Sequence, residues 1–274
     1  MNLSTEPGEA PADPIAPIAP LERLDWRIGL YDMYRTNPCG WYRWIFGRIV
    51  ARPDAHVMDI GCGTARFWQV NRDRIPVGWH VFLADKSRDM ANHVQQTVKP
   101  LLRCTVAPII VDAPIIPFPD KSLDAILAMH VLHLVQDLED LLREVRRVLK
   151  KNGRLYATAG SLMRLKHLDA FGTACCPAVK VLEKDPRKSF CAENGKGILI
   201  SHGFRNVRDM EYKDTIEFED LETLFRYIRT TDGSSKAALE HPSIDALTEF
   251  FQAMLLTDGR ITVNNDAALF EARP

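Results

Sequence analysis

Three carboxylates stand at the ends of three successive apolar segments in the first half of this 274-residue sequence. Asp59 stands two residues before Gly61, Asp85 follows the apolar residues 79–84, and Asp112 follows residues 104–111. Groups that follow the strands of a doubly wound sheet lie at one edge of that sheet. Carboxylates there can accept hydrogen bonds from an ammonium, from two ribose hydroxyls and from an adenine amino group. The spacing therefore indicates a site for a cationic nucleoside without phosphate.

The glycine turn at residues 61–63 argues against a dinucleotide ligand. Gly61 and Gly63, with Cys62 between them, let the backbone pass close to a ligand, an approach that a Cβ would block. A dinucleotide fingerprint, G-x-G-x-x-G, needs a third glycine where this chain has Arg66. A nicotinamide-dependent reductase is therefore disfavoured.

Alternating strands and helices must position these acids. The predicted strands are residues 55–60, 79–84, 104–111, 123–129 and 154–159, and the helices between them are 64–74, 88–98 and 138–149. A turn at Asn152-Gly153 leads into the fifth strand, and the last strands come from residues 207–218 and from a hairpin of 260–263 with 267–272. This order predicts an α/β, Rossmann-like, doubly wound and mostly parallel seven-stranded sheet.

The flanking regions divide the chain into four predicted parts. Residues 1–20 form a proline-rich disordered tail, and residues 21–52 an aromatic helical cap whose two helices meet at a turn in 37–40. Residues 53–160 are the binding core. Residues 161–274 form a lid with helices at 162–171, 190–201, 220–230 and 244–255, together with the final sheet strands.

Four segments of the core resemble the class I S-adenosylmethionine-dependent methyltransferases, in particular the group with a UbiE-like domain. They are VMDIGCGTA, LADKSRDM, DAPIIPFPDKSLDAILAMHVLHLVQD and EVRRVLKKNGRLYAT, in the family's order. The sequence departs from the pattern at Ala65, where a third glycine is usual, and at Leu134, where the group often has a second histidine.

The resemblance implies S-adenosylmethionine as cofactor and S-adenosylhomocysteine as product. Asp59 would hold the ammonium, Asp85 the ribose hydroxyls and Asp112 the adenine amino group. The other residues implied to contact the cofactor are Gly61, Cys62, Gly63, Lys86, Met90, Ala113 and Met129.

Two histidines and one tyrosine are the candidate catalytic residues. His130 and His133 follow the fourth strand, where the resembled family faces the methionine end of the cofactor and the substrate. A histidine suits removal of a proton from an acceptor, so His130 is the first candidate base and His133 the second. Tyr34, Trp41 or Tyr42 could face the sulfonium, and Tyr34 is the preferred candidate. The alternative is that these side chains only pack in the core.

The composition limits the classes of molecule that the protein is expected to bind. A formal net charge of −1 gives no general attraction to nucleic acid or membrane, and no apolar run is long enough to span a membrane. The six cysteines include no C-x-x-C pair, so neither a metal site nor disulfides are expected, and a cytoplasmic protein is predicted. We expect a small-molecule acceptor and, through the aromatic N-terminal helices, self-association into a homo-oligomer.

The sequence is compatible with several functions. The leading hypothesis is methyl transfer to a natural-product, secondary-metabolite or quinone-like acceptor at oxygen, nitrogen or carbon. The alternative is a protein that binds S-adenosylmethionine without methyl transfer, as a cyclase or a regulatory binding module. A protein or RNA methyltransferase is disfavoured by the neutral charge.

Overall fold

The computed structural model describes residues 20–112, 114–163, 186–230 and 244–274, and its chain divides into two compact units. The sheet unit comprises Cys39–Leu162, Pro186–Lys213 and Asp266–Pro274, and the ribbon unit comprises Met1–Pro38, Met163–Asp185 and Asp214–Asn265. The predicted turn at residues 37–40 therefore joins helices of different units, α1 (Pro20–Tyr34) and α2 (Trp41–Phe46).

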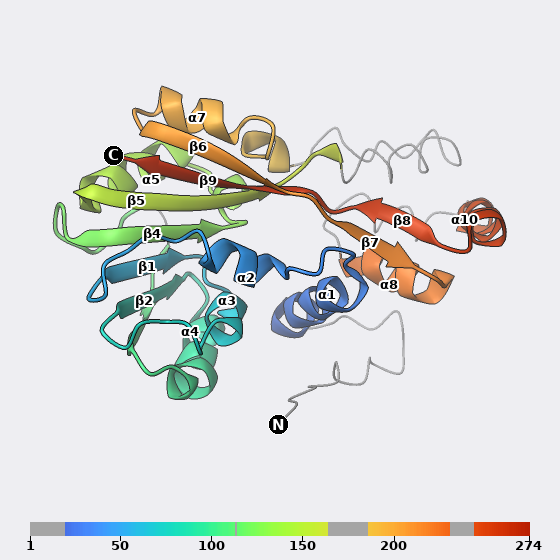
Figure 1. The fold of residues 1–274 in the computed structure, drawn as a ribbon, viewed down its shortest axis with the longest axis horizontal. Helices are drawn as coiled ribbons and strands as arrows, with labels where there is room; N and C mark the ends of the chain where they lie inside the picture. Colours follow the sequence, from blue (N-terminus) through green and yellow to red (C-terminus); the bar gives the residue numbers. More distant parts are fainter. Residues whose placement is uncertain (1–19, 113, 164–185, 231–243) are drawn as a thin grey trace. The chain divides into compact units, whose positions relative to one another are not determined.

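Seven strands form one sheet in the order β3-β2-β1-β4-β5-β9-β6 (Figure 1). Their bounds are β1 His56–Ile60, β2 His80–Asp85, β3 Thr105–Ile110, β4 Leu123–Met129, β5 Leu149–Gly160, β6 Arg205–Tyr212 and β9 Ala267–Arg273. Strands β1 to β5 pair in parallel, whereas β9 runs antiparallel to both β5 and β6. The predicted Rossmann-like, mostly parallel seven-stranded sheet is confirmed.

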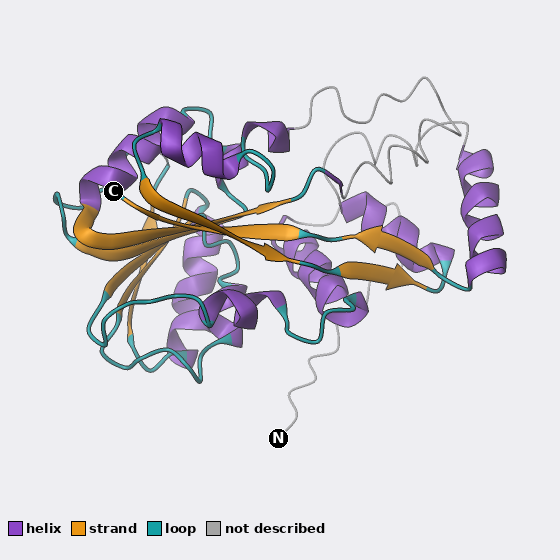
Figure 2. Cartoon of the chain, turned by 45° about the horizontal axis from the view of Figure 1, so that its top comes forward, coloured by secondary structure: helices purple, strands orange, loops and turns teal. Residues whose placement is uncertain are grey.

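Helices cover both faces of this sheet (Figure 2). Met58 and Ile60 of β1 pack in one core with α5 (Leu138–Val148) and α7 (Gly195–Ser201). Val57 faces the opposite core, with α2 and α3 (Arg66–Val70). Helix α4 (Arg88–His93) continues as a π-helix, Val94–Val98, and a 3-10 turn, Lys99–Leu101. Burial on both faces is why the central strands are almost continuous apolar runs in the sequence.

Two helices start later than predicted. Helix α3 begins at Arg66 rather than residue 64, because Gly63 and Ala65 keep φ angles of 54° and 55°, which are left-handed. Helix α7 begins at Gly195 rather than residue 190, after a 3-10 turn at Pro186–Ser189. There the Cys191 N–H donates to the Asn194 side chain, which holds residues 191–194 in a turn.

The predictions for the C-terminal strands were wrong in two respects. Residues 207–218 form two strands rather than one, β6 in the large sheet and β7 (Thr215–Phe218) in a two-stranded ribbon. The expected hairpin does not form, because β8 (Ile261–Asn264) pairs with β7 while β9 pairs with β5 and β6. Strand β9 is buried along most of its length and suits a central position, whereas β8 alternates buried and exposed residues.

The fifth strand contains the predicted Asn152-Gly153 turn as an irregularity. The register shifts from Leu123 opposite Leu149 to Ala125 opposite Arg154, so residues 150–153 bulge out of the ladder. A Cβ on Gly153 would lie 2.9 Å from the Lys150 carbonyl oxygen, which explains why glycine stands there.

The ribbon unit has its own core. Strands β7 and β8 pack with α1, α8 (Leu221–Thr230) and α10 (Ile244–Asp258), so the helices predicted at 220–230 and 244–255 are confirmed. Ile216, Phe218 and Tyr227 are completely buried there. The helix predicted at 162–171 lies, apart from residues 162 and 163, outside the described residues, as do Cys175 and Cys176.

Candidate active site

The turn between β1 and α3 packs tightly against the segment that follows β4. Gly61 has a φ of 67°, and a Cβ on it would lie 2.5 Å from the Val131 Cγ2 atom. The Cys62 N–H donates to the Ala84 carbonyl over 3.0 Å, which ties the turn to β2 as well. Only glycine satisfies both the left-handed backbone and the contact with Val131. The turn thus lies where the ends of three neighbouring strands meet.

Asp59 is a buried carboxylate at the end of β1. Its Oδ2 atom accepts a 2.8 Å hydrogen bond from the Trp68 indole, and its Oδ1 atom has no partner among the described residues. Burial raises the pKa of Asp59 to about 7, against the lowering effect of the Trp68 bond. A buried carboxylate oxygen without a donor is costly, so this atom is suited to a donor or cation supplied by a ligand.

Asp85 ends β2, and its carboxylate accepts hydrogen bonds from the backbone of two neighbouring turns. Its Oδ2 atom accepts from the Gly63 N–H over 3.0 Å, and its Oδ1 atom accepts from the Ser87 N–H over 2.9 Å. A carboxylate offers about four lone-pair sites, so each oxygen keeps capacity for one further donor. Two hydroxyls on adjacent carbons match that capacity. Lys86 is exposed, and the Met90 N–H is capped by Ser87 Oγ at the start of α4.

Asp112 lies near Asp85 at the end of β3. The Val111 N–H donates to the Asp85 backbone carbonyl over 3.0 Å, and the next residue, Asp112, has an exposed side chain. The third acid of the sequence pattern therefore lies at the same sheet edge as the other two. Ala113 is outside the described residues.

His130 follows β4 in a strained backbone conformation. Its φ is 51°, and its N–H donates to the carbonyl and the hydroxyl of Thr158 at 3.2 and 3.1 Å. A left-handed conformation in a residue other than glycine costs roughly 1–3 kcal/mol and is concentrated at functional sites. The side chain is exposed, and Met129 before it is partly buried. Since Val131 contacts the glycine turn, His130 stands beside that turn.

Aromatic side chains pack beside His130. The ring centroid of Trp41 lies 5.6 Å from that of His130, and Trp41 also contacts Trp44 at 5.5 Å and Tyr212 at 4.9 Å. We call Trp41, Trp44 and Tyr212 the aromatic group. The Trp41 indole nitrogen is buried and has no hydrogen-bond partner among the described residues. The sequence had offered Trp41 only as one of three aromatic candidates.

The other two catalytic candidates have structural contacts elsewhere. His133 lies in a 3-10 turn, Leu132–Leu134, where its carbonyl accepts from the Ser189 hydroxyl. Tyr34 ends α1 in the ribbon unit, where its ring packs 5.8 Å from that of Phe218. Their catalytic roles stay predictions.

Sequence reasoning missed the residues that support this site. The Trp68 indole donates a hydrogen bond to Asp59, and Val131 packs against Gly61. Thr158 accepts a hydrogen bond from the His130 N–H. The only signal for Trp68 was its position nine residues after Asp59, on the helix that follows the turn. The Val131 and Thr158 contacts depend on the neighbouring order of β1, β4 and β5, which no local pattern encodes.

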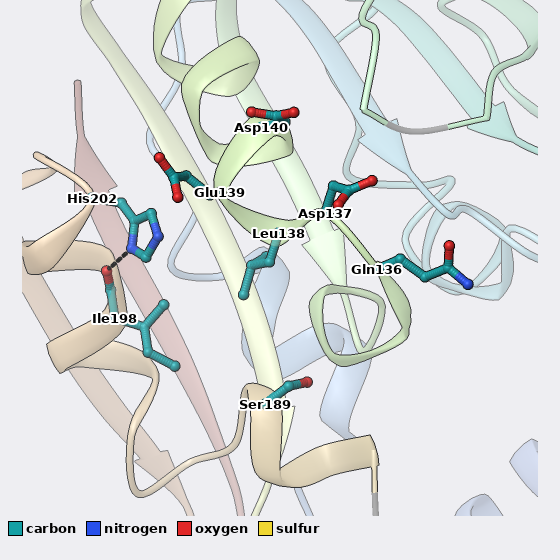
Figure 3. A pocket seen from close by; sticks show the side chains of 8 residues that line it. All are labelled: Gln136, Asp137, Leu138, Glu139, Asp140, Ser189, Ile198 and His202. Carbon is teal, nitrogen blue, oxygen red and sulfur yellow. Dashed lines mark hydrogen bonds between the residues drawn. The ribbon is translucent and has the colours of Figure 1, made fainter.

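One pocket lies away from these residues, between α5 and α7. It encloses about 490 Å³ and is lined by Gln136, Asp137, Leu138, Glu139, Asp140, Ser189, Ile198 and His202. Figure 3 shows Glu139 and His202 on one side of it and Gln136 on the other. Its acids Glu139 and Asp140 pair with Arg143. Cys62, Cys104 and Cys191 form no disulfide. In the described part of the chain, no cluster of His, Cys, Asp or Glu could hold a metal ion, and no helix is long and apolar enough to cross a membrane.

The site at the carboxyl ends of β1, β2 and β3 fits the cofactor that the sequence resemblance implies. The unpartnered Asp59 oxygen suits an ammonium, the free capacity of Asp85 suits a ribose diol, and the glycine turn, packed on Val131, lies between these two carboxylates and His130. Each fit concerns a different part of one cationic nucleoside.

Sequence comparisons agree with this geometry. A family model described as a methyltransferase domain matches residues 58–157. The ubiquinone/menaquinone biosynthesis C-methyltransferase UbiE of Vibrio parahaemolyticus is 30% identical over 188 residues, which are 61% of this chain and 71% of that protein. The demethylmenaquinone methyltransferase of Listeria welshimeri is 35% identical over 100 residues, 36% of this chain and 42% of that protein. The chain thus spans less than half of the Listeria relative.

A solved structure shows the same fold. A protein of Bacillus halodurans described as a methyltransferase aligns with a TM-score of 0.56 at 15% identity, over 85% of this chain and 98% of that one. The [4+2]-cyclase SpnF aligns with a TM-score of 0.52 at 18% identity, over 88% of this chain and 86% of that one. At these identities the structures establish a shared architecture and leave the reaction to the residues of the site.

Proposed function

Because this chain belongs to the class I S-adenosylmethionine-dependent methyltransferases, we propose that it methylates a small molecule carrying a hydroxylated, electron-rich ring. S-adenosylmethionine is its cofactor, and S-adenosylhomocysteine is the product released. The observation that carries the acceptor proposal is the strained, exposed His130 beside the aromatic group and the glycine turn.

The first catalytic requirement is alignment. When bound, the cofactor supplies an electrophilic methyl group on a positively charged sulfur. Asp59 would hold the ammonium and Asp85 the ribose diol, so a bound cofactor would be fixed at two separate points. Lys86, Met90 and Met129 complete its surroundings. Fixing reactants in line contributes as much as about 7–11 kcal/mol to such displacements.

The second requirement is a nucleophile. We assign His130 the removal of the proton from the acceptor hydroxyl, which raises the electron density of the ring carbon beside it. Histidine is the side chain that exchanges protons most readily near neutral pH. Trp41 and Trp44 are only partly buried, so their rings offer flat, apolar surface against which a planar acceptor can lie next to His130.

The relatives favour carbon as the methylated atom. The Vibrio parahaemolyticus protein is by its name a C-methyltransferase of ubiquinone and menaquinone biosynthesis. We therefore propose a quinol-type ring as the first acceptor to test. Natural products and secondary metabolites are the wider acceptor classes expected from the sequence, and those that carry a phenol present the same hydroxyl and ring carbon to the site. The neutral overall charge makes nucleic acid the weaker acceptor.

The test of this function is a methyl-transfer assay with product analysis. Purified protein is incubated with methyl-labelled cofactor and a panel of quinols, phenols and amines, and the products are identified by mass spectrometry. A carbon-methylated quinol, formed together with S-adenosylhomocysteine, is the expected result. An acceptor rearranged without gaining a methyl group would favour the cyclase-like alternative. Labelling of amines alone would overturn the ring-acceptor proposal.

Replacing His130 tests the assigned base. His130→Ala is expected to bind S-adenosylhomocysteine like the parent but to lose about 10²–10⁴-fold in kcat, the usual contribution of a general base. His80→Gln is a matched control, because His80 is exposed at the opposite, amino end of β2. Full turnover by His130→Ala on a confirmed acceptor would remove His130 from the mechanism.

Asp59 makes cofactor affinity depend on pH. The raised pKa of about 7 means that the unliganded protein keeps this carboxyl protonated below pH 7, and a cationic ligand favours the ionised form. Affinity for S-adenosylhomocysteine should therefore rise from acidic pH to about pH 7 and then level off. The stability of the unliganded protein changes in the opposite direction, falling as pH rises from the ordinary 3.8 towards 7.

Calorimetric titration at several pH values measures this dependence. Asp59→Asn keeps an acceptor for the Trp68 indole but does not titrate, so its affinity should be lower above pH 7 and lack the rise seen in the parent. Identical pH profiles for parent and variant would show that Asp59 does not face the ammonium.

A further inference from the structure

One arginine outside the proposed site, Arg147 of α5, makes three hydrogen bonds to the connection between β3 and β4 and two to a glutamate of its own helix. Within α5, Arg147 donates to both carboxylate oxygens of Glu144 at 2.7 and 2.8 Å. It also donates to the carbonyl oxygens of Ile116 and Phe118 at 3.0 and 2.9 Å, and to the Asp120 carboxylate at 2.7 Å. A guanidinium has five N–H groups, and five acceptors are in place.

Glu144 also binds the β3–β4 connection directly. Its carboxylate accepts the Ile116 N–H over 3.2 Å, so both backbone groups of Ile116 are bound to α5. The hydrogen bond from Arg147 is the main reason that the pKa of Glu144 lies below its usual value, and the pair stays charged at neutral pH. Ile116 is 2% exposed, and the Phe118 ring packs edge-on against Phe82 of β2 at 4.7 Å. Residues 116–120 are thus fixed to both α5 and the sheet.

The same connection carries Asp112, the acid assigned to the adenine amino group. Its start is tied to β2 by the bond from the Val111 N–H to the Asp85 carbonyl. Its later part is tied to α5 by Arg147 and Glu144. Asp112 itself is exposed and four residues before Ile116, so these two attachments limit where its carboxylate can lie.

We propose that Arg147 and Glu144 are positioning residues for recognition of the cofactor's base, acting through the β3–β4 connection on Asp112. The inference rests on the proposed cofactor site, since it concerns how one acid of that site is held. Neither residue would contact the cofactor itself. Their effect is on which purine the site accepts and how tightly it binds, while the chemistry at the methyl group is unchanged.

A purely structural role would weaken every ligand alike, so base discrimination is the decisive readout. The probes are S-adenosylhomocysteine and its analogue without the exocyclic amino group, titrated calorimetrically into the full-length protein. The parent should prefer S-adenosylhomocysteine. Arg147→Gln should bind it about tenfold more weakly, within the usual range for mutations that couple to a site from outside, and bind the analogue unchanged. In turnover assays, the KM for the cofactor should rise while kcat stays constant.

Arg143→Gln is the matched control. Arg143 lies one turn earlier on α5, is 64% exposed in its side chain, and pairs with Glu139 and Asp140 of the same helix. Its removal should change neither affinity nor preference, since exposed pairs of this kind contribute little. Arg147→Lys keeps the charge without the five-donor fork and should be intermediate.

Three results would overturn the proposal. They are equal weakening of both ligands by Arg147→Gln, no change with either ligand, and a parent that does not discriminate between them. If Arg147→Gln fails to fold, Glu144→Gln, which keeps an acceptor for Ile116, carries the same expectation with a smaller change. Failure of the parent to bind S-adenosylhomocysteine would instead contradict the proposed cofactor site itself. That result differs from the three above, in all of which the parent binds this ligand.

Discussion

Gly61→Ala is expected to destabilise the protein by about 2–5 kcal/mol and to abolish measurable cofactor binding. The left-handed backbone alone costs a residue with a Cβ about 1–2 kcal/mol, and overpacking adds about 1–3 kcal/mol. The overpacking follows from the 2.5 Å between the added Cβ and Val131 Cγ2. Relief of that clash would move the glycine turn away from β4 and so spoil the cofactor surface. Thermal unfolding and titration with S-adenosylhomocysteine measure both effects.

Two variants separate the causes. Gly61→Ala with Val131→Ala removes the nearest methyl groups, so it should recover part of the overpacking loss but none of the backbone strain. Gly197→Ala is the control, because its Cβ would have no atom within 4 Å in the exposed part of α7. This change should stabilise slightly, by up to about 1 kcal/mol. If Gly61→Ala matched the parent in stability and binding, the packing of Val131 on the turn would be irrelevant to function.

Asp85→Ala is the second change with a large expected effect. It removes the carboxylate assigned to the ribose diol and the acceptor for two backbone N–H groups, those of Gly63 and Ser87. Charged hydrogen bonds contribute about 1.5–3 kcal/mol, so affinity for S-adenosylhomocysteine should fall roughly 10–150-fold. Because the glycine turn and the start of α4 both lose a bond, a smaller loss of stability should accompany it.

The comparison is with Asp89→Ala, which removes an exposed carboxylate from the first turn of α4. That variant should keep cofactor affinity within about twofold, as surface substitutions change free energies by at most about 0.5 kcal/mol. Asp85→Asn should fall between parent and alanine variant, since an amide keeps one acceptor oxygen. Parental affinity in Asp85→Ala would show that the ribose is held elsewhere.

The sequence by itself determined the parallel core and the order of its acids. Buried parallel strands need continuous apolar runs, and each run here ends at the turn or acid that the sheet brings to its carboxyl edge. The glycines at 61 and 63 were equally readable, since a left-handed turn admits few other residues. Local rules of this kind require no knowledge of which strands are neighbours.

Only the tertiary structure decided which side chains and strands from distant segments surround the acids at the carboxyl edge of the sheet. The failed hairpin shows the limit, because residues 261–264 and 267–273 are close in sequence yet pair with strands of different sheets. Three further contacts also join segments that are distant in the sequence. Trp41 packs on His130, Thr158 accepts the His130 N–H, and Arg147 donates to Ile116 of the β3–β4 connection. A side chain's own sequence neighbourhood carries no record of such partners, because they are selected by the energy of packing the whole chain.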